Sequence, residues 1–408
     1  MKLRLNLFKV RLIIVSVIVV AASVFFGYWL GTHQVKVSLQ NRLQIKVDRK
    51  LPVDKQNIDF SLFWEVWDRL EQDYLDKSSL DQTEMVFGAI QGMVSALDDP
   101  YTVFLKPPEN KEVKDDLDGA FEGVGIQLGY QNEQLTVIAP LKGTPAFKAG
   151  VKTGDLILKI DDKPTSEITL PEAVKMIRGP KGTEVVLTLL HKGEKETYEA
   201  KIERDTIIVA SVEVEFVDDE QIAHLRLLKF GDRTTEEWNK AVQEITNHQP
   251  KVKGVVLDLR NNPGGYLSGS VFIASEFLSS GIVVQQERAD GKGKETYSVN
   301  RTGHLLDIPL VILVNGGSAS ASEIVAGALQ DHNRSQVMGE PSFGKGTIQE
   351  AEDLSGGAGL HITTARWLLP SGRSINKEGI EPDIEAKDDP ETLETDEQLQ
   401  KAIENLNQ

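Results

Sequence analysis

The sequence has no cysteine in 408 residues. The chain therefore forms no disulfide, has no thiol nucleophile and offers no thiolate ligand to a metal ion. Basic residues are also scarce, because 45 lysines and arginines face 62 aspartates and glutamates, which gives a formal net charge of −17. Such a surface repels nucleic acid, so we expect no nucleic-acid partner.

The composition is otherwise that of a globular protein, with 40% hydrophobic and 26% charged residues. A chain of this length is sufficient for two or three domains with a sizeable core. The question is therefore how the chain is divided, and which of its motifs carry chemistry.

The N-terminus has the pattern of a membrane anchor. A basic segment, 1–11, precedes the uncharged run Leu12–Thr32. At about 1.5 Å per residue, a helix over this run crosses a hydrocarbon core of about 30 Å. The basic flank favours a cytoplasmic N-terminus, which places the linker at 33–57 and everything after it on the extracytoplasmic side of the cell membrane. A cleavable signal peptide ending near Ala21-Ala22-Ser23 is the alternative, but the apolar run continues to Leu30, which favours an uncleaved anchor.

The region 58–116 predicts two amphipathic helices. Apolar residues recur with helical spacing in two stretches, Phe63, Val66, Trp67, Leu70 and Tyr74 in the first and Val86, Ala89, Ile90, Met93 and Leu97 in the second. Asp81 and Glu84 form a capping-box pattern before the second helix, and Pro100 in "DDPY" ends it. We expect these helices to pack on the core or on a second copy. In the second case the chain forms a homo-oligomer through its N-terminal and C-terminal helical regions.

Residues 117–204 have the pattern of a small β-rich module. Short strand-like runs alternate with glycines, and one helical stretch, "LPEAVKMIRG", lies before the last of them. The motifs "EGVGI" and "AGVKTGDLILKID" resemble those of a PDZ domain. The resemblance implies that Gly123, Val124, Gly125 and Ile126 offer backbone N–H groups to the terminal carboxylate of a protein or peptide substrate. By itself, Gly-x-Gly is equally typical of a tight turn; the downstream motif favours the PDZ interpretation.

From residue 205 to 386, strand and helix patterns alternate. The runs "IAHLRLLKF", "GVVLDLR" and "PLVILVN" predict buried strands, and "TTEEWNKAVQEITNH" and "SASEIVAGALQDH" predict helices. This alternation indicates an α/β domain, with a mixed sheet and flanking helices. The tail, 387–408, is acidic and ends in a short helical pattern at Leu399, Ile403 and Leu406.

Three serines on alternate positions follow the last of these strands, in "VNGGSASASEI". Local sequence favours a structural role for Ser320, because Ser320 and Glu323 form a capping box. The same position suits a nucleophile, since a strand-to-helix turn holds the hydroxyl out of the sheet and the helix N-terminus favours developing negative charge. Ala319 and Ala321 leave room for a substrate backbone.

A serine nucleophile needs a base to accept its proton. None of the seven histidines lies in a motif typical of catalysis, whereas "GEPSFGKGTIQ" places Lys345 between two glycines. Burial lowers the pKa of a lysine from about 10.4 by up to about 3–5 units, which provides a neutral amine at pH 7. A flexible surface lysine is the ordinary alternative. A phosphate-binding loop is rejected, because Gly346 stands where a serine or threonine would bind magnesium.

The motifs "DDPYTVFL", "DLRNNPGG", "VNGGSASASEI" and "GKGTIQ", in this order around the PDZ-like module, resemble those of the C-terminal processing peptidases, or tail-specific proteases. The resemblance covers about residues 60–384. It implies that Ser320 is the nucleophile, Lys345 the general base and Gln349 a residue that orients the lysine. Because Gln349 follows Lys345 by four residues, we expect the two on one helical face.

The resemblance also implies an oxyanion hole, which needs two convergent N–H donors. One is expected from Ala321 and the other from "NNPGG", with Gly265 preferred and Gly264 the alternative. By itself this stretch is typical of a turn after a strand, with Asp258 and Arg260 as an ordinary buried pair.

The sequence therefore predicts a membrane-anchored, extracytoplasmic serine endopeptidase with a helical region (58–116), a PDZ domain (117–204) and an α/β protease core (205–386). The PDZ domain would capture the C-terminal region of a protein substrate, and Ser320 and Lys345 would cleave it through an acyl-enzyme without a metal or nucleotide cofactor. The alternative is a PDZ scaffold or adaptor at the membrane whose core is inactive. The presence of Ser320, Lys345 and Gln349 together argues against that alternative.

Overall fold

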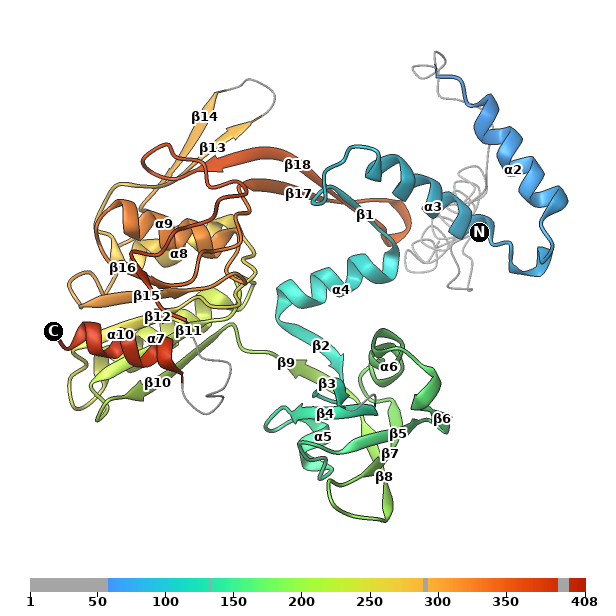
Figure 1. Cartoon of the computed structure of the whole chain (residues 1–408), viewed down its shortest axis with the longest axis horizontal. Helices are drawn as coiled ribbons and strands as arrows, with labels where there is room; N and C mark the ends of the chain where they lie inside the picture. The colour runs from blue at the N-terminus through green and yellow to red at the C-terminus, as the bar shows by residue number, and fades with distance from the viewer. Residues whose placement is uncertain (1–57, 132–133, 289–292, 388–395) are drawn as a thin grey trace, which may run out of the picture. The chain divides into compact units, whose positions relative to one another are not determined.

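The computed structural model describes residues 58–131, 134–288, 293–387 and 396–408 (Figure 1). The predicted membrane span, 12–32, and the predicted linker, 33–57, lie outside the described residues. Among the residues that are described, no helix is both long and apolar enough to cross a membrane. The chain divides into two units, Met1–Ala89 and Ile90–Gln408.

Two helices lie where the apolar periodicity predicts them. The elements here are α2 (Ser61–Asp73), the 3-10 turn η2 (Lys77–Ser79) and α3 (Gln82–Ser95), of which α3 continues into the second unit. Trp67 of α2 is buried, but Val66, Leu70 and Tyr74 of the same predicted stripe are exposed. The apolar stripe of α2 is therefore only partly covered within its own unit.

The protease core is built on a sheet whose described strands follow the order β10-β11-β12-β15-β16-β19. These strands are β10 (Val212–Val217), β11 (Ile222–Leu227), β12 (Gly254–Asp258), β15 (Leu310–Val314), β16 (Gln336–Gly339) and β19 (Ile384–Glu385). β10 is antiparallel to β11, and the other neighbours are parallel, as expected where longer crossovers connect successive strands. The predicted mixed sheet is confirmed.

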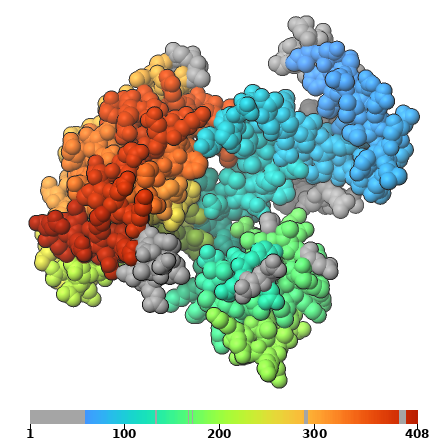
Figure 2. Space-filling model, viewed as in Figure 1, coloured from blue at the N-terminus to red at the C-terminus, as the bar shows by residue number. Residues whose placement is uncertain are grey.

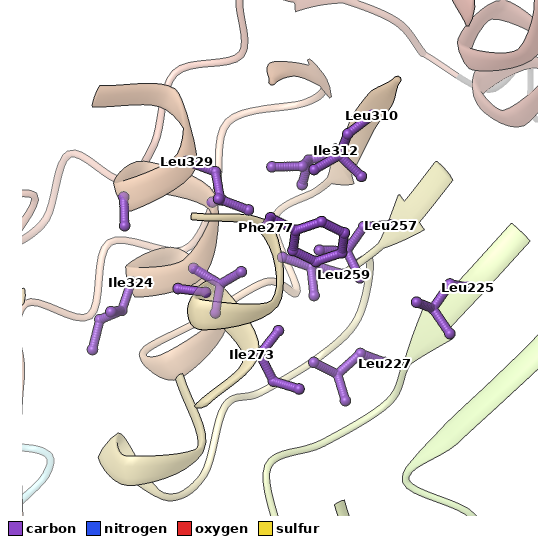
Figure 3. Close-up of a cluster of buried hydrophobic side chains, with 14 of the residues drawn as sticks. Leu225, Leu227, Leu257, Leu259, Ile273, Phe277, Leu310, Ile312, Ile324 and Leu329 are labelled. Carbon is purple, nitrogen blue, oxygen red and sulfur yellow. The ribbon is translucent and has the colours of Figure 1, made fainter. Parts of the chain in front are cut away.

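Helices cover both faces of this sheet. They are α7 (Thr234–Asn247), α8 (Leu267–Phe277), α9 (Ala321–Asp331) and α10 (Glu397–Leu406). Successive strand residues point to opposite faces, so alternate side chains form two cores. On one face, Leu225 of β11 and Leu257 of β12 pack with the side chains of α7, α8 and α9, among them Phe277 of α8 (Figure 3). On the other face, Val311 packs with Ala402 of α10, the red helix in Figure 1, and red atoms from the C-terminal part of the chain lie at the surface in Figure 2.

A second sheet of the core is centred on β18, which pairs antiparallel with β1, β13 and β17. Its elements are β1 (Val103–Leu105), β13 (Ile282–Arg288), β14 (Lys294–Ser298), β17 (Thr347–Asp353), η4 (Ser355–Gly357) and β18 (Gly359–Leu368), and α4 (Pro107–Asp118) follows β1. The segment 58–116, expected to be helical, thus also contributes a strand to the core. Three residues are too few to show an alternating pattern in the sequence.

The PDZ-like module has its own sheet and its own core, in which Val137, Ile157 and Leu187 are buried. Its elements are β3 (Ile126–Gln131), β4 (Gln134–Pro140), α5 (Pro145–Lys148), β5 (Leu156–Ile160), β6 (Lys163–Pro164), η3 (Thr165–Glu167), α6 (Leu170–Ile177), β7 (Glu184–Leu190) and β8 (Thr197–Glu203). A two-stranded ribbon of β2 (Ala120–Gly123) and β9 (Asp205–Ile208) joins the two ends of the module.

Candidate active site

Ser320 lies where β15 turns into α9. All residues of β15 are buried, and the chain leaves the sheet through Asn315-Gly316-Gly317. Ser320 has φ 55° and ψ −114°, a backbone conformation that residues other than glycine rarely adopt. Such a conformation persists only where the surrounding structure holds it, and it is common at functional sites. The turn is therefore of the strand-to-helix type that presents a side chain above a sheet.

The other two serines of the motif have structural roles. Ser318 and Ser322 are fully buried, and their hydroxyls donate to the carbonyl oxygens of Leu259 and Asn262, each at 2.8 Å. Ser320 is half-buried and lines a pocket with a volume of about 680 Å³. The geometry thus favours Ser320 over its neighbours as the nucleophile.

Lys345 lines the same pocket as Ser320. Burial lowers the pKa of its amine, while the negative charges of Asp99 and Glu323 oppose that shift. The Nζ atom lies 4.9 Å from the centre of the Tyr101 ring. Among the described residues no hydrogen bond joins this amine to Ser320, although both residues line the same pocket.

Glu323 connects the serine turn to the lysine loop. Its Oε2 accepts hydrogen bonds from the backbone N–H groups of Ser320 at 2.7 Å and Lys345 at 3.0 Å. Its Oε1 accepts from the Ser342 hydroxyl at 2.6 Å and the Gly344 N–H at 2.7 Å. Burial raises the pKa of this carboxyl, and the hydrogen bonds oppose the shift. The sequence identified Glu323 only as a capping residue, because its partners in the lysine loop are far away in the chain.

Gln349 lies on β17, so the prediction that it shares a helical face with Lys345 is wrong. A spacing of four residues places two side chains on one face of a helix and also on one face of a strand, so this spacing does not distinguish the two. Gln349 nevertheless lines the pocket together with Lys345. Its Nε2 donates to the hydroxyls of Thr347 at 3.0 Å and Thr363 at 3.1 Å.

The glycines of "NNPGG" lie against the serine turn. A Cβ at Gly264 would lie 2.8 Å from the Cβ of Ser320, so only glycine fits there. The Gly264 N–H already donates a hydrogen bond to the side chain of Asn262 at 2.9 Å, which competes with binding of an oxyanion. The N–H groups of Gly265 and Ala321 donate to no described residue, and both residues line the pocket. The geometry therefore favours Gly265 over Gly264 as the oxyanion donor that acts with Ala321.

Helix α4 forms a wall of this pocket and is tied to the core. Its residues Val113 and Leu117 line the pocket beside Tyr266. The Leu117 carbonyl accepts a hydrogen bond from the Asp232 N–H at 3.0 Å. A Cβ at Gly231 would lie 2.2 Å from that carbonyl oxygen, so glycine permits the close approach. The pocket is thus assembled from the N-terminal part of the second unit as well as from the core sheet.

The predicted pair Asp258 and Arg260 belongs to a larger network behind the oxyanion loop. Arg260 bonds both carboxylate oxygens of Asp258 and, at 2.7 and 2.8 Å, those of Asp396 before α10. His224 lies 2.9 Å from the second Asp258 oxygen. Burial would raise the pKa of Asp258, but the contacts with His224 and Arg260 outweigh it and hold the pKa well below its usual range. The network fixes the end of β12, from which "NNPGG" begins.

The predicted carboxylate-binding loop joins β2 to β3. Gly123 ends β2, and Ile126 begins β3. Gly125 has φ 78°, and a Cβ there would lie 2.4 Å from the Cβ of Thr144, so glycine is required on both counts. The N–H groups of Val124 and Gly125 donate to no described residue. Both residues are buried, and an anionic group bound at this loop would give their N–H groups an acceptor.

Comparisons with known proteins agree with this geometry. Family models match at residues 221–386 for peptidase family S41, at 136–190 for a PDZ domain, and at 17–107 for the N-terminal domain of the activating protease CtpB. A carboxy-terminal-processing protease from Bartonella bacilliformis is 40% identical over 79% of this chain and 74% of its own length. The chain belongs to peptidase family S41.

One further relative supports this membership, and one solved structure has the same fold. The carboxy-terminal processing protease CtpA of Bacillus subtilis is 35% identical, over 79% of this chain and 67% of its own length. The structure of an S41 protease from Bacteroides fragilis NCTC 9343 has a TM-score of 0.56 at 15% identity, and the match covers 83% of this chain and 96% of that one, which shows the shared fold. This S41 member is a serine-type peptidase with a PDZ domain, and its resemblance to the C-terminal processing peptidases is confirmed.

Proposed function

We propose that this S41 peptidase is an endopeptidase that captures the C-terminal region of a protein substrate with its PDZ domain and cleaves the substrate with Ser320 and Lys345. One observation carries the proposal. Ser320 and Lys345 line the same pocket, and their backbone N–H groups are bonded to the same oxygen of Glu323. The nucleophile and the base are thereby held on neighbouring loops.

Acylation follows from this arrangement. The neutral amine of Lys345 accepts the proton of the Ser320 hydroxyl as the oxygen attacks the substrate carbonyl carbon. The carbonyl oxygen becomes an oxyanion, to which the N–H groups of Gly265 and Ala321 donate. The C–N bond then breaks, the leaving amine takes the proton back from Lys345, and an ester to Ser320 remains.

Deacylation uses the same groups. Lys345 accepts a proton from water, the water oxygen attacks the acyl carbon, and the ester bond to Ser320 breaks as the serine regains a proton. Burial suits the amine to this work, because a lowered pKa leaves more of it neutral. In this proposal Gln349 orients the lysine: its Oε1 accepts a hydrogen bond from the Lys345 amine when the amine turns toward Ser320.

Two substitutions test the dyad. Ser320→Ala and Lys345→Ala are each expected to lower kcat/KM on an unfolded protein substrate by about 10³-fold or more. Ser280→Ala and Lys251→Ala serve as matched controls, since both residues are exposed and neither lines the pocket. Circular dichroism checks that each variant is folded. Retained cleavage by either of the first two variants would exclude the dyad.

Substrate capture is tested separately. The N–H groups of Val124 and Gly125, which have no acceptor in the part of the chain that the structure describes, support recognition of a terminal carboxylate. A peptide with a free C-terminus is therefore expected to have a KM at least about tenfold lower than the same peptide with an amidated end. Equal KM values would exclude this mode of capture and leave the dyad untouched.

We also propose that residues 12–32 anchor the protein in the cell membrane, with the peptidase on the extracytoplasmic side. The basic flank and the uncharged run support this. The full chain is expected to sediment with membranes, and a chain beginning at residue 33 to stay in the supernatant. Equal distribution of the two chains would contradict the anchor.

Self-association through the helical regions is part of the same proposal. Leu62, Val66 and Leu70 of α2 are exposed apolar residues, which supports a partner for this face. Light scattering of the chain from residue 33 is expected to give the mass of a dimer or a larger oligomer. The Val66→Glu variant is expected to have a lower mass, closer to that of a monomer. A monomer at all concentrations would exclude it.

A further inference from the structure

The motif "DDPYT", residues 98–102, has no role in the proposed reaction, yet the fold places it beside the base. The strand that follows it, β1, pairs with β18. The Tyr101 ring centre lies 4.9 Å from Lys345 Nζ, a distance at which an ammonium group is attracted to an aromatic face. Asp99 is the carboxylate that most favours the charged form of the same amine.

The turn is built to hold these two side chains in place. Asp99 accepts hydrogen bonds from the Tyr101 N–H at 3.1 Å and from the Thr102 hydroxyl at 2.6 Å. The Thr102 hydroxyl in turn accepts from the N–H of Thr363 on β18 at 3.1 Å. Burial raises the pKa of Asp99, but its hydrogen bonds, those from Thr102 and Thr363 foremost, outweigh burial and lower it. Asp99 is therefore a fixed negative charge near the base.

Other charged groups also face Lys345. Glu323 on α9 favours the ammonium less than Asp99 does, and its oxygens are occupied by backbone and hydroxyl donors. On β18, His361 has a pKa lowered by burial and then by the lysine charge. Across the pocket α4 contributes three carboxylates, Glu109, Glu112 and Asp116. None of these groups makes the ring contact that Tyr101 makes with the amine.

This contact conflicts with the needs of catalysis. A general base must be neutral, whereas the face of an aromatic ring attracts the protonated amine. Within the described residues the amine has no hydrogen bond to Ser320, and Gln349 donates to Thr347 and Thr363. This arrangement therefore suits a protonated Lys345 that is not yet acting as a base.

We propose that Tyr101 and Asp99 form a holding site for the ammonium form of Lys345, which keeps the base away from Ser320 until it loses its proton. The proposal rests on the dyad proposed above. In this step one N–H bond of the ammonium breaks, a solvent water takes the proton, and the neutral amine leaves the ring. Tyr101 and Asp99 are thus positioning residues, which act on the lysine and not on the substrate.

The first test titrates the amine in the full chain with Ser320→Ala, so that no turnover is needed. Competitive labelling with acetic anhydride between about pH 6 and 11, read by mass spectrometry of the Lys345 peptide, gives its apparent pKa. Tyr101→Leu removes the ring and is expected to lower this pKa by about 0.4 to 1.5 pH units. Tyr101→Phe keeps the ring face and is expected to leave the value unchanged.

Charge variants make a second, independent comparison. Asp99→Asn removes the charge but keeps an oxygen that accepts from the Tyr101 N–H, and it is expected to lower the same pKa. Asp98→Asn removes an exposed charge one residue away and is the matched control, since water and salt screen that charge. If Tyr101→Leu does not fold, the Asp99→Asn and Asp98→Asn pair decides the result.

With Ser320 intact, the same variants are expected to move the rising limb of kcat/KM against pH to lower pH. Below that limb, Tyr101→Leu is then about 3- to 30-fold more active than the unaltered chain. Equal pKa values for folded Tyr101→Leu and Tyr101→Phe, or for the two aspartate variants, would overturn the holding site. Retained activity in Lys345→Ala would overturn the dyad instead, so the two failures are distinguishable.

Discussion

The serine turn, 315–322, and the lysine loop, 339–346, are held in different ways. Hydrogen bonds fix the serine turn on both sides of Ser320, through Ser318 and Ser322, and also at the Ser320 N–H. The lysine loop is fixed along its backbone, because Glu323 binds the Lys345 N–H and the indole of Trp367 donates to the Lys345 carbonyl at 2.9 Å. Its amine makes no hydrogen bond to any described residue.

This difference matches the chemistry of the two residues. A nucleophile must meet one carbonyl carbon beside fixed oxyanion donors, and a displacement of about 1 Å costs about 10²-fold in rate. A base has to exchange protons with the serine, the leaving amine and a water in turn. A flexible four-carbon side chain on a fixed backbone suits those three tasks. The comparison therefore predicts that changes to the fixed elements damage geometry, and that changes to the amine alter protonation.

The largest effect is expected when the base cannot release its proton. Lys345 works only when neutral, and burial lowers its pKa below 10.5. Activity of the unaltered enzyme is therefore expected to rise as pH rises through this lowered pKa and to be lost below it. Lys345→Arg keeps the charge and the length but stays protonated, so kcat/KM is expected to fall by about 10³-fold or more at every pH. Activity that does not depend on pH in the unaltered enzyme would contradict a lysine base.

Glu323→Ala is expected to damage both fixed elements together. It removes the acceptor of three buried or half-buried N–H groups and one hydroxyl, which lowers the free energy of unfolding by at least about 2 kcal/mol. The serine and the lysine also lose their shared tether, so kcat/KM is expected to fall by about 10²-fold. Denaturant unfolding and peptide hydrolysis measure the two effects.

The matched control is Glu244→Ala, an exposed glutamate on α7. It is expected to change neither quantity, since surface substitutions away from such networks have small effects. Full activity in a folded Glu323→Ala protein would show that the tether does not position the dyad.

Gly264→Ala disturbs the serine side alone. The new Cβ would lie 2.7 Å from the Ala319 oxygen and 2.8 Å from the Ser320 Cβ, and Gly264 has φ 97°. We expect the serine or the oxyanion loop to shift, with a loss of kcat of about 10- to 100-fold. Gly316→Ala lies in the serine turn itself, where a new Cβ would have no atom within 4 Å, so it is the control and is expected to retain activity. Similar losses in the two variants would mean that the loop contact is unimportant.

Strong local patterns made much of this fold predictable. β15 is an uninterrupted apolar run, and α9 begins at a serine and a glutamate in capping positions, so both were found from the sequence. The strand β1 was missed, since only three residues of it pair with β18. Gln349 was placed on a helix because its spacing from Lys345 fits two kinds of secondary structure.

The connections within the site were less predictable, because they depend on contacts distant in sequence. Glu323 was visible as a cap, but its bonds to Ser342 and Gly344 exist only after β16 has joined the sheet beside β15. The contact of Tyr101 with Lys345 likewise joins residues that are far apart in the chain, at positions 101 and 345. In the sequence, the proline of "DDPY" indicates the end of a helix and "DDPYTVFL" contributes to the family resemblance, but neither pattern indicates a contact with the base.

The smallest effects are expected for substitutions of Ser318 and Ser322, and they distinguish these two structural serines from Ser320. Ser322→Ala removes one buried hydroxyl that donates to Asn262, so the free energy of unfolding is expected to fall by about 1 kcal/mol. Ser318→Ala is expected to cost about 2 kcal/mol, since that hydroxyl donates to Leu259 and also accepts from the Asn315 N–H at 3.0 Å. Because Ser320 keeps its other tethers in both variants, kcat/KM is expected to fall by less than about tenfold. A folded Ser322→Ala protein without activity would reverse the roles of Ser320 and Ser322, and with them the distinction between a fixed nucleophile and a mobile base.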